Sequence, residues 1–425
     1  MPNIRNCRKA SNTQRVLLPA ETLERVWPVA RSLGVTRVAD ITGLDRIGIP
    51  IYSAVVPRSQ DGLSASNGKG IFPIEAKAGA VMEAIERQTA CKTRLPLIQG
   101  CFRELSRGRT VLDPRNCRHT LVPNYSERRV YFWVAGRDLS TDGEVLVPAH
   151  VAGFAWNDVP PGPFSGYCSS NGLSSGNIRE EAICQGLCEL IERDAWTIAD
   201  IGAHLLPLVR RQVADPENAA NGPDDFELFP SIEAQDDPAS HLFRKADLHP
   251  ILHDITSDLG IPTVFAVVAD ESFPSFPMIH VGAGTHPDVH VAARRALTEA
   301  AQSRCIDIQG VREDLVSAGS IIDGLYLHTR RAVGINRNLW FLGESKRPRR
   351  LDELPSVVHD DIQEDLNHIL ARLNSRGIFQ IIVVDFTPPD APFSVVRVIV
   401  PELESASINR GPLGQRAVEF WRAHV

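Results

Sequence analysis

Residues 171–196 read NGLSSGNIREEAICQGLCELIERDAW, and this stretch decides the fold that we expect. The small residues from Gly172 to Asn177 suit a tight turn followed by a helix N-terminus. A helix is predicted from about residue 178, because apolar side chains then recur at helical spacing. These apolar positions are Ile183, Leu187, Leu190 and Ile191. The opposite face carries the carboxylates of Glu181, Glu189 and Glu192.

An ordinary explanation exists for one such helix. Glu189 and Arg193 are four residues apart, so an exposed ion pair on a solvated face accounts for them. A second copy of the pattern weakens that explanation. The order E-A, six residues, E-A-I-E-R begins at Glu75, and E-A, six residues, E-L-I-E-R begins at Glu181. Because a Gly-Leu-Ser turn precedes each copy, at 62–64 and 172–174, we predict a duplicated turn-helix unit.

Two such helices can pair with their carboxylates facing a shared cleft. Gathered carboxylates need cations, and a site built only from oxygen ligands favours magnesium. Magnesium in turn points to nucleotide phosphates.

Length and charge exclude several classes of protein. A chain of 425 residues is long enough for one large elaborated domain or for two or three domains. A net charge of -7 argues against nonspecific nucleic-acid binding and against a polybasic membrane contact. No run approaches the roughly 18 apolar residues of a membrane span, and the start MPNIRNCRKASNTQR has no apolar core. We therefore expect a cytoplasmic protein without nucleic-acid or membrane partners.

The 8 cysteines are spread along the chain and form no C-x-x-C pair. In a reducing compartment they are expected to be small buried residues or free thiols. Cys184 and Cys188 lie four apart on the central helix, so a shared metal is an alternative, which the lack of a second close pair disfavours.

Three parts of the chain are expected: an N-terminal arm and helix over 1–34, a main domain over 35–405 with a surface insertion at 215–240, and a C-terminal tail over 406–425. Residues 1–17 are predicted to be a mobile arm, and 61–70 a Gly/Ser loop whose Gly68-Lys69-Gly70 could contact phosphate or be a plain turn. Predicted helices cover 19–33, 75–93, 178–201, 248–260, 289–312 and 360–374, with a short one near the C-terminus. Predicted strands cover 36–42, 47–56, 130–134, 144–148, 262–268, 277–284, 380–384 and 392–400.

The helix predicted over 289–312 contains RRALTEAAQSR and has a polar face. Arg295, Glu299 and Gln302 lie on that face, whereas Arg304 lies well around the helix from Glu299. A solvated amphipathic face explains this spacing at least as well as a binding site does.

The motifs taken together resemble the YcaO family. They are the Gly68-Lys69-Gly70 loop, E-x-x-E-R, S-G-N with a second E-x-x-E-R-D, and A-L-T-E-A-x-Q-S-R, and they cover roughly residues 35–405. The stretches TRVADITGLDRIGIP and SSNGLSSGN look most like the family members that work with a partner called TfuA.

This resemblance implies an α+β fold of mixed sheets and long helices, duplicated around a nucleotide cleft that binds ATP and Mg2+. It also implies O-phosphorylation of a backbone amide in a peptide or protein substrate. A neighbouring Cys, Ser or Thr side chain would then give an azoline, and sulfide would give a thioamide. A TfuA-like partner protein is implied as well, while the oligomeric state stays open, a homo-oligomer included.

The resemblance also assigns residues. Those matching the family's magnesium carboxylates are Glu83, Glu86, Glu189 and Glu192. Those matching its nucleotide contacts are Ser174, Asn177 and Glu181, joined by Lys69. Those matching other polar positions of the ATP cleft, expected to be catalytic, are Arg87, Arg193, Glu299, Gln302 and Arg304.

Two departures from the family pattern bear on the reaction. Gly79 stands where many members have a serine, and the end GQRAVEFWRAHV lacks the P-x-P-x-P of many azoline-forming members. Thioamide formation is therefore expected ahead of cyclodehydration. A catalytically silent peptide-binding scaffold is the alternative from another class.

Overall fold

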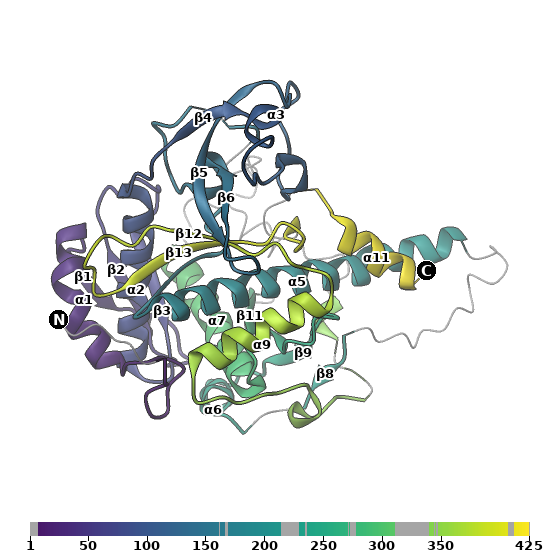
Figure 1. The fold of residues 1–425 in the computed structure, drawn as a ribbon. Helices are drawn as coiled ribbons and strands as arrows, with labels where there is room; N and C mark the ends of the chain where they lie inside the picture. The colour runs from purple at the N-terminus through teal and green to yellow at the C-terminus, as the bar shows by residue number, and fades with distance from the viewer. Residues whose placement is uncertain are drawn as a thin grey trace, which may run out of the picture.

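The computed structural model describes residues 7–160, 162–165, 169–213, 229–233, 236–270, 272, 278–310, 340–343, 345, 347–406 and 412–424. Its helices are α1 (Pro19–Leu33), α2 (Pro73–Lys92), α3 (Phe102–Leu105), α4 (Ala149–Ala152), α5 (Arg179–Val213), α6 (Pro238–Lys245), α7 (Val289–Gly310), α9 (Ile362–Ser375) and α11 (Gln415–His424). Figure 1 shows the long helix α5 running across the middle of the molecule, with α9 beside it.

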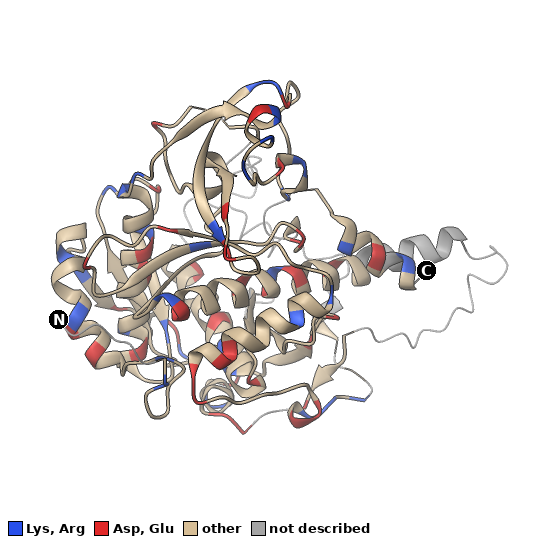
Figure 2. Cartoon of the chain, in the orientation of Figure 1, with Lys and Arg blue, Asp and Glu red and all other residues tan. Residues whose placement is uncertain are grey.

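Basic and acidic positions are interspersed along the chain in the view of Figure 2. None of the helices in the described ranges combines the length and the apolar character that a bilayer crossing needs.

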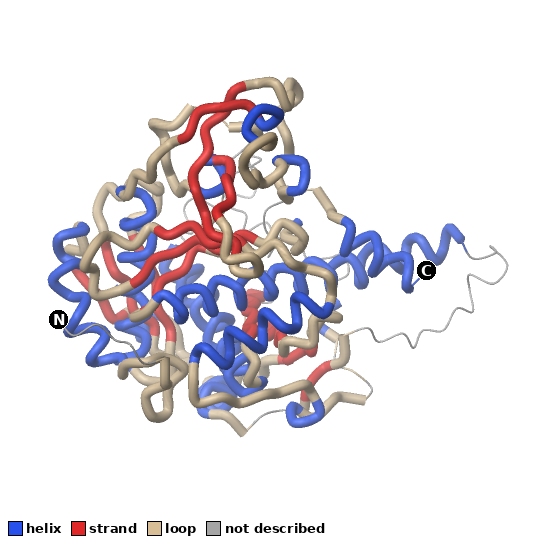
Figure 3. The backbone as a smooth tube through the Cα atoms, viewed as in Figure 1, coloured by secondary structure: helices blue, strands red, loops and turns tan. Residues whose placement is uncertain are grey.

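Three antiparallel sheets form within the described residues, as Figure 3 shows in red. The first contains, in order, β1 (Arg37–Asp40), β2 (Ile51–Val55) and β3 (Ala65–Lys69). The second contains β11 (Met278–Thr285), β10 (Thr263–Asp270), β9 (Ile251–Asp254) and β8 (Ser231–Ile232). The third contains β4 (Ile98–Cys101), β5 (Val130–Asp138), β12 (Ile382–Asp385), β13 (Ser394–Ile399) and β7 (Leu173–Gly176), with β6 (Glu144–Pro148) paired to β5. Mixed helices and antiparallel sheets confirm the α+β expectation.

The third sheet is buried on both faces where it passes through the core. Val396 and Val398 of β13 pack with α5 and α9. Their neighbours Val395 and Ile399 point to the other face, where they pack with α1 and α2. The alternation follows from the period of two in a strand. The sheet thus separates the two helices that carry the E-x-x-E-R motifs.

Each sheet ends in an edge strand that is followed directly by a helix packed on it: β3 by α2, β7 by α5 and β11 by α7. Each helix also contacts the edge strand of another unit, α2 meeting β7, α5 meeting β11 and α7 meeting β3. The three strand-helix units therefore close into a ring. The expected duplication is present, and β11 with α7 forms a third unit of the same kind.

Close backbone approach holds each unit together. A Cβ atom added at Gly68 of β3 would lie 2.0 Å from the Ala76 carbonyl oxygen. One added at Gly282 of β11 would lie 2.3 Å from the Ala296 carbonyl oxygen. Only glycine leaves room for a helix backbone at that distance.

Two loops of the sequence prediction are strands instead. Residues 65–69, within the expected Gly/Ser loop 61–70, form β3 paired with β2, and residues 173–176 form β7 paired with β13. The small residues in these two strands allow the following helix to pack closely and do not form a turn. The helix expected over 248–260 was also wrong, because Ile251–Asp254 pairs with β10 as β9.

The arm predicted to be mobile over 1–17 is bound to the domain in its described part, residues 7–17. The Ile362 amide donates to the Cys7 carbonyl at 2.9 Å, and Lys9 Nζ lies 2.6 Å from Asp365 Oδ2. Residues 214–228, most of the expected insertion 215–240, lie outside the described residues, and its end belongs to α6. The cysteines within the described ranges are free thiols.

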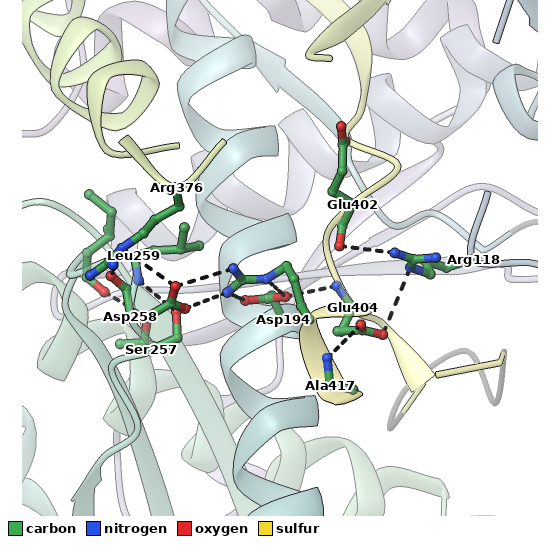
Figure 4. Close-up of polar contacts among 12 residues, drawn as sticks. Arg118, Asp194, Ser257, Asp258, Leu259, Arg376, Glu402, Glu404 and Ala417 are labelled. Carbon is green, nitrogen blue, oxygen red and sulfur yellow. Dashed lines mark hydrogen bonds and ion pairs between the residues drawn. The ribbon is translucent and has the colours of Figure 1, made fainter. Parts of the chain in front are cut away.

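The C-terminal segment is fastened to α5, as Figure 4 shows. The fully buried Asp194 accepts hydrogen bonds from the Glu404 amide at 2.9 Å and from Arg416 Nη2 at 2.8 Å. Arg416 Nη2 also lies 2.7 Å from Asp258 Oδ1. Glu404 in turn accepts a hydrogen bond from the Ala417 amide at 3.0 Å. Because Asp194 follows directly on the E-x-x-E-R motif of α5, these bonds tie the chain end to the motif helix.

The close approach predicts opposite effects for two glycine-to-alanine substitutions. Gly282→Ala should lower the unfolding free energy by about 2–3 kcal/mol or more, because backbone atoms must move to admit the methyl group. Gly79→Ala in α2 is the control. A Cβ atom added at Gly79 would meet nothing closer than the Cα of Gly68 in β3, at 3.4 Å. This substitution should raise stability by about 0.5–1 kcal/mol through helix propensity. Urea unfolding measures both, and equal stability of Gly282→Ala and the wild type would contradict the packing described.

Candidate active site

Glutamates from both motif helices gather on the inside of the ring. Glu83 and Glu86 come from α2, and Glu189 and Glu192 come from α5. Burial, followed by the charges of Glu83 and Glu189, raises the pKa of Glu86 well above its ordinary value. Carboxylates of the two helices therefore lie near enough to repel one another. The structure brings the four predicted magnesium ligands together.

Burial is the main cause of the pKa shifts in this cluster. It raises the pKa of Glu83 and of Glu189 despite the opposing charges of Arg87 and Arg193. It raises the pKa of Glu192 to about 7. Part of the cluster is thus protonated near neutral pH, because burying several like charges together costs free energy.

Cations face the cluster from two sides. Arg193 Nη2 lies 3.7 Å from Glu189, and its Nη1 lies 3.4 Å from Glu192. Lys69 Nζ lies 2.5 Å from Glu299 Oε2, which joins β3 to α7. Burial alone would raise the pKa of Glu299, but Lys69 and then Arg193 outweigh burial and lower it. The third unit therefore contributes an ionised carboxylate to the same place.

Hydrogen bonds link the edge strands to the helices around the cluster. The Asn67 amide donates to Glu83 Oε2 at 2.9 Å, and the Gly172 amide donates to Glu189 Oε2 at 3.3 Å. Gln302 Nε2 donates to the Asn67 carbonyl at 2.9 Å. Each first motif glutamate thus accepts a hydrogen bond from a backbone amide of its own unit, in β3 for Glu83 and just before β7 for Glu189.

The donor set fits magnesium in chemical type. The clustered side chains offer carboxylate oxygens, the ligand type that magnesium prefers, and burial is the first cause of their raised pKa values. Across the described part of the chain, no three His, Cys, Asp or Glu side chains are already grouped as metal ligands. Magnesium is commonly held by one or two carboxylates together with phosphate oxygens, so these glutamates suit a metal that arrives with its nucleotide.

Ser174, Asn177 and Glu181 are buried near the start of α5. Ser174 Oγ donates to the Ala182 carbonyl at 2.6 Å. Glu181 Oε2 accepts hydrogen bonds from the Asn177 amide at 2.7 Å and from its side chain at 3.1 Å. Asn177 and Glu181 therefore hold each other in place, while Ser174 is held separately by the backbone of α5.

Sequence reasoning missed two residues that contact Asn177 and Glu181. Thr22 Oγ1 donates to Asn177 Oδ1 at 3.0 Å, and Arg15 Nη1 lies 3.9 Å from Glu181 Oε2. Both precede their partners Asn177 and Glu181 by more than a hundred residues, and no spacing in the sequence connects them with α5.

Two predicted arginines have other partners. Arg304 is buried and lies 3.1 Å from Asp45 and 2.8 Å from Asp270, on the far side of α7 from Glu299. The structure does not bring it into the cluster, since helical spacing points it elsewhere. Arg87 pairs with Asp61 at 2.6 Å and stacks over Phe154. Of the expected catalytic residues, Arg193, Glu299 and Gln302 lie with the glutamates, and the charge of Arg87 also acts on Glu83 and Glu86.

Partly buried carboxylates from three units, beside hydrogen-bonding side chains at a helix N-terminus, are the groups that enzymes use to bind a nucleotide with magnesium. The profile of the YcaO family, described as YcaO cyclodehydratase, ATP- and Mg2+-binding, matches residues 67–404. The chain belongs to the YcaO family, which confirms the resemblance.

Relatives match over nearly the whole chain. A protein of Methanothermobacter thermautotrophicus, named only as uncharacterized, is 36% identical over 401 residues, covering 94% of this chain and 97% of the relative. A protein of Rhizobium leguminosarum bv. trifolii, named for its place in the tfuA 3' region, is 34% identical over 414 residues, covering 96% of this chain and 93% of the relative.

Solved structures agree with the fold. YcaO from Methanopyrus kandleri bound with AMPPCP and Mg2+ has 25% sequence identity and a TM-score of 0.70, and the match covers 94% of this chain and 96% of that one. A heterocyclase in complex with substrate and cofactor has 20% identity and a TM-score of 0.72, covering 98% of this chain and 58% of that one.

The raised pKa of Glu192 predicts how stability depends on pH without metal or nucleotide. Its folded value of about 7 exceeds the ordinary 4.5, so the folded state binds the proton more tightly. The resulting stability is fully present below pH 4.5 and is lost as pH rises through about 7. Glu192→Gln should therefore gain about 3 kcal/mol relative to the wild type between pH 4.5 and 8.

Calorimetry across this pH range measures the difference. The exposed Glu24 of α1 supplies the control, since Glu24→Gln removes the same charge and should stay parallel to the wild type. If the stability of Glu192→Gln also changed with pH in parallel to that of the wild type, Glu192 would ionise normally.

Proposed function

We propose that this protein activates a peptide backbone amide by ATP-dependent O-phosphorylation. The observation that carries the proposal is the gathering of Glu83, Glu86, Glu189 and Glu192 from two equivalent helices, with Lys69 and Arg193 beside them. Family membership supports it, because the family is described as binding ATP and Mg2+.

The chain's own residues suit this chemistry. An amide oxygen is a weak nucleophile, so catalysis must come from positioning and from neutralising charge. Bound with magnesium, ATP supplies the phosphoryl group that makes the amide oxygen a leaving group. The motif glutamates would hold the metal, and Ser174, Asn177 and Glu181 would contact the nucleotide. Arg193 and Lys69, which lie beside Glu189 and Glu299, would stabilise negative charge on the transferred oxygens.

We place thioamide formation ahead of ring closure. Sulfide would add to the activated carbon, and the former amide oxygen would leave as phosphate. The relative from the tfuA 3' region supports this order and makes a TfuA-like protein the proposed partner. Cyclodehydration is the second candidate, favoured by the family's description and by the heterocyclase fold.

Substitution of a motif glutamate tests the activation step. Glu86→Ala should lower magnesium-dependent ATP hydrolysis by about a hundredfold or more, because its carboxylate would no longer hold the metal. Glu104→Ala, at an exposed position of α3, should hydrolyse ATP at the wild-type rate. Full ATP hydrolysis by Glu86→Ala, with circular dichroism showing an intact fold, would contradict the assignment of this glutamate cluster to metal binding.

Mass spectrometry separates the two products. The purified protein is incubated with ATP, magnesium, sulfide and a candidate peptide, with and without a TfuA-like protein. A mass gain equal to exchange of oxygen for sulfur supports the thioamide. Loss of one water supports azoline formation and reverses our order, and binding of peptide without ATP consumption supports the scaffold alternative.

A further inference from the structure

Residues 7–16 form a strap that runs from the start of α9 to the start of α5. At one end the Lys9 amide donates to the Asp360 carbonyl at 2.8 Å, and the Ile362 amide donates to the Cys7 carbonyl at 2.9 Å. At the other end the Val16 amide donates to Glu181 Oε1 at 2.5 Å. The strap thus connects α9 with a glutamate that we assign to nucleotide binding.

An ion pair fixes the α9 end of the strap. Lys9 Nζ lies 2.6 Å from Asp365 Oδ2, and the two side chains are 8% and 1% exposed. His359 Nδ1 lies 2.9 Å from Asp365 Oδ1, and His286 Nε2 lies 3.9 Å from its Oδ2. A buried carboxylate needs a cation, so removing Lys9 would leave Asp365 with histidines alone.

The glutamate end of the strap depends on few bonds. Glu181 is 1% exposed, and Asn177 and Val16 supply its hydrogen bonds. Arg15 reinforces the Val16 side, since its Nη2 donates to Gln185 Oε1 at 3.5 Å. If the strap lifted, the carboxylate would lose a short charge-assisted hydrogen bond, and its orientation would no longer be fixed.

We propose that Lys9 and Asp365 are positioning residues for Glu181: their ion pair holds the strap, and the strap orients the glutamate for the nucleotide. The inference rests on the proposed function. According to this inference, part of the affinity for the nucleotide depends on the contact between the strap and α9, a helix that carries none of the motif residues.

Calorimetric titration with AMPPCP and magnesium tests the inference without a peptide substrate. Lys9→Met and Asp365→Asn should each weaken binding about tenfold, because each removes the buried pair. The double variant should be no weaker than either single one, since both changes break the same link. Lys9→Arg keeps the charge and should bind within about threefold of the wild type.

Arg109→Met is the matched control. Its ion pair with Glu144 is exposed and far from the strap in the sheet of β5 and β6, so affinity should not change. Should Lys9→Met fail to fold, Val16→Pro tests the same link at its other end, since it removes the donor to Glu181 and leaves the ion pair in place.

The outcomes are distinct. Lower melting temperatures with unchanged AMPPCP affinity would give the ion pair a merely structural role and overturn the inference, while the proposed function would stand. A wild-type protein that binds no AMPPCP would overturn the proposed function and the inference together.

Discussion

Close contact between a strand backbone and a helix backbone is the constraint on which this molecule depends, and it occurs in each of the three units. At Gly68 and Gly282 the helix lies where a side chain would otherwise be. In β7 the strand keeps Ser174 and the helix supplies the small residue, since a Cβ at Gly186 would lie 2.8 Å from Ser174 Oγ. Each helix is thereby held at a fixed depth on an edge strand, with its polar face directed at the other units.

The charge distribution follows from that arrangement. Two units present glutamates of the E-x-x-E-R motif. The third unit presents Glu299 of α7, which Lys69 of the first unit neutralises. Packing provides the burial, and burial raises the pKa values of the motif glutamates. The protein thus holds carboxylates in a place where they are costly alone. On the proposed function, a divalent cation would relieve this cost, and perturbed pKa values of this kind are common at functional sites.

Much of the site could be predicted from the sequence, because E-x-x-E-R recurs and helical spacing fixes which side chains share a face. The strands β3 and β7 could not, since glycine and serine have low strand propensity and only the packed helix explains them. The third unit was missed although Gly282-Ala283-Gly284 precedes an alanine-rich helix, because that helix lacks the glutamate motif. Arg15 and Thr22 were missed because their partners lie far away in the sequence, and contacts of that range leave no periodic signal.

Both ends of the described chain meet on α5, and this has a consequence for synthesis and folding. Val16 is 165 residues from Glu181, and Arg416 is 222 residues from Asp194. On the ribosome, α5 emerges before Arg416 exists, so Asp194 stays without its guanidinium partner until 222 further residues have been added. Loops of that length close slowly. The motif helix is therefore complete long before the residue that pairs with its buried aspartate is made.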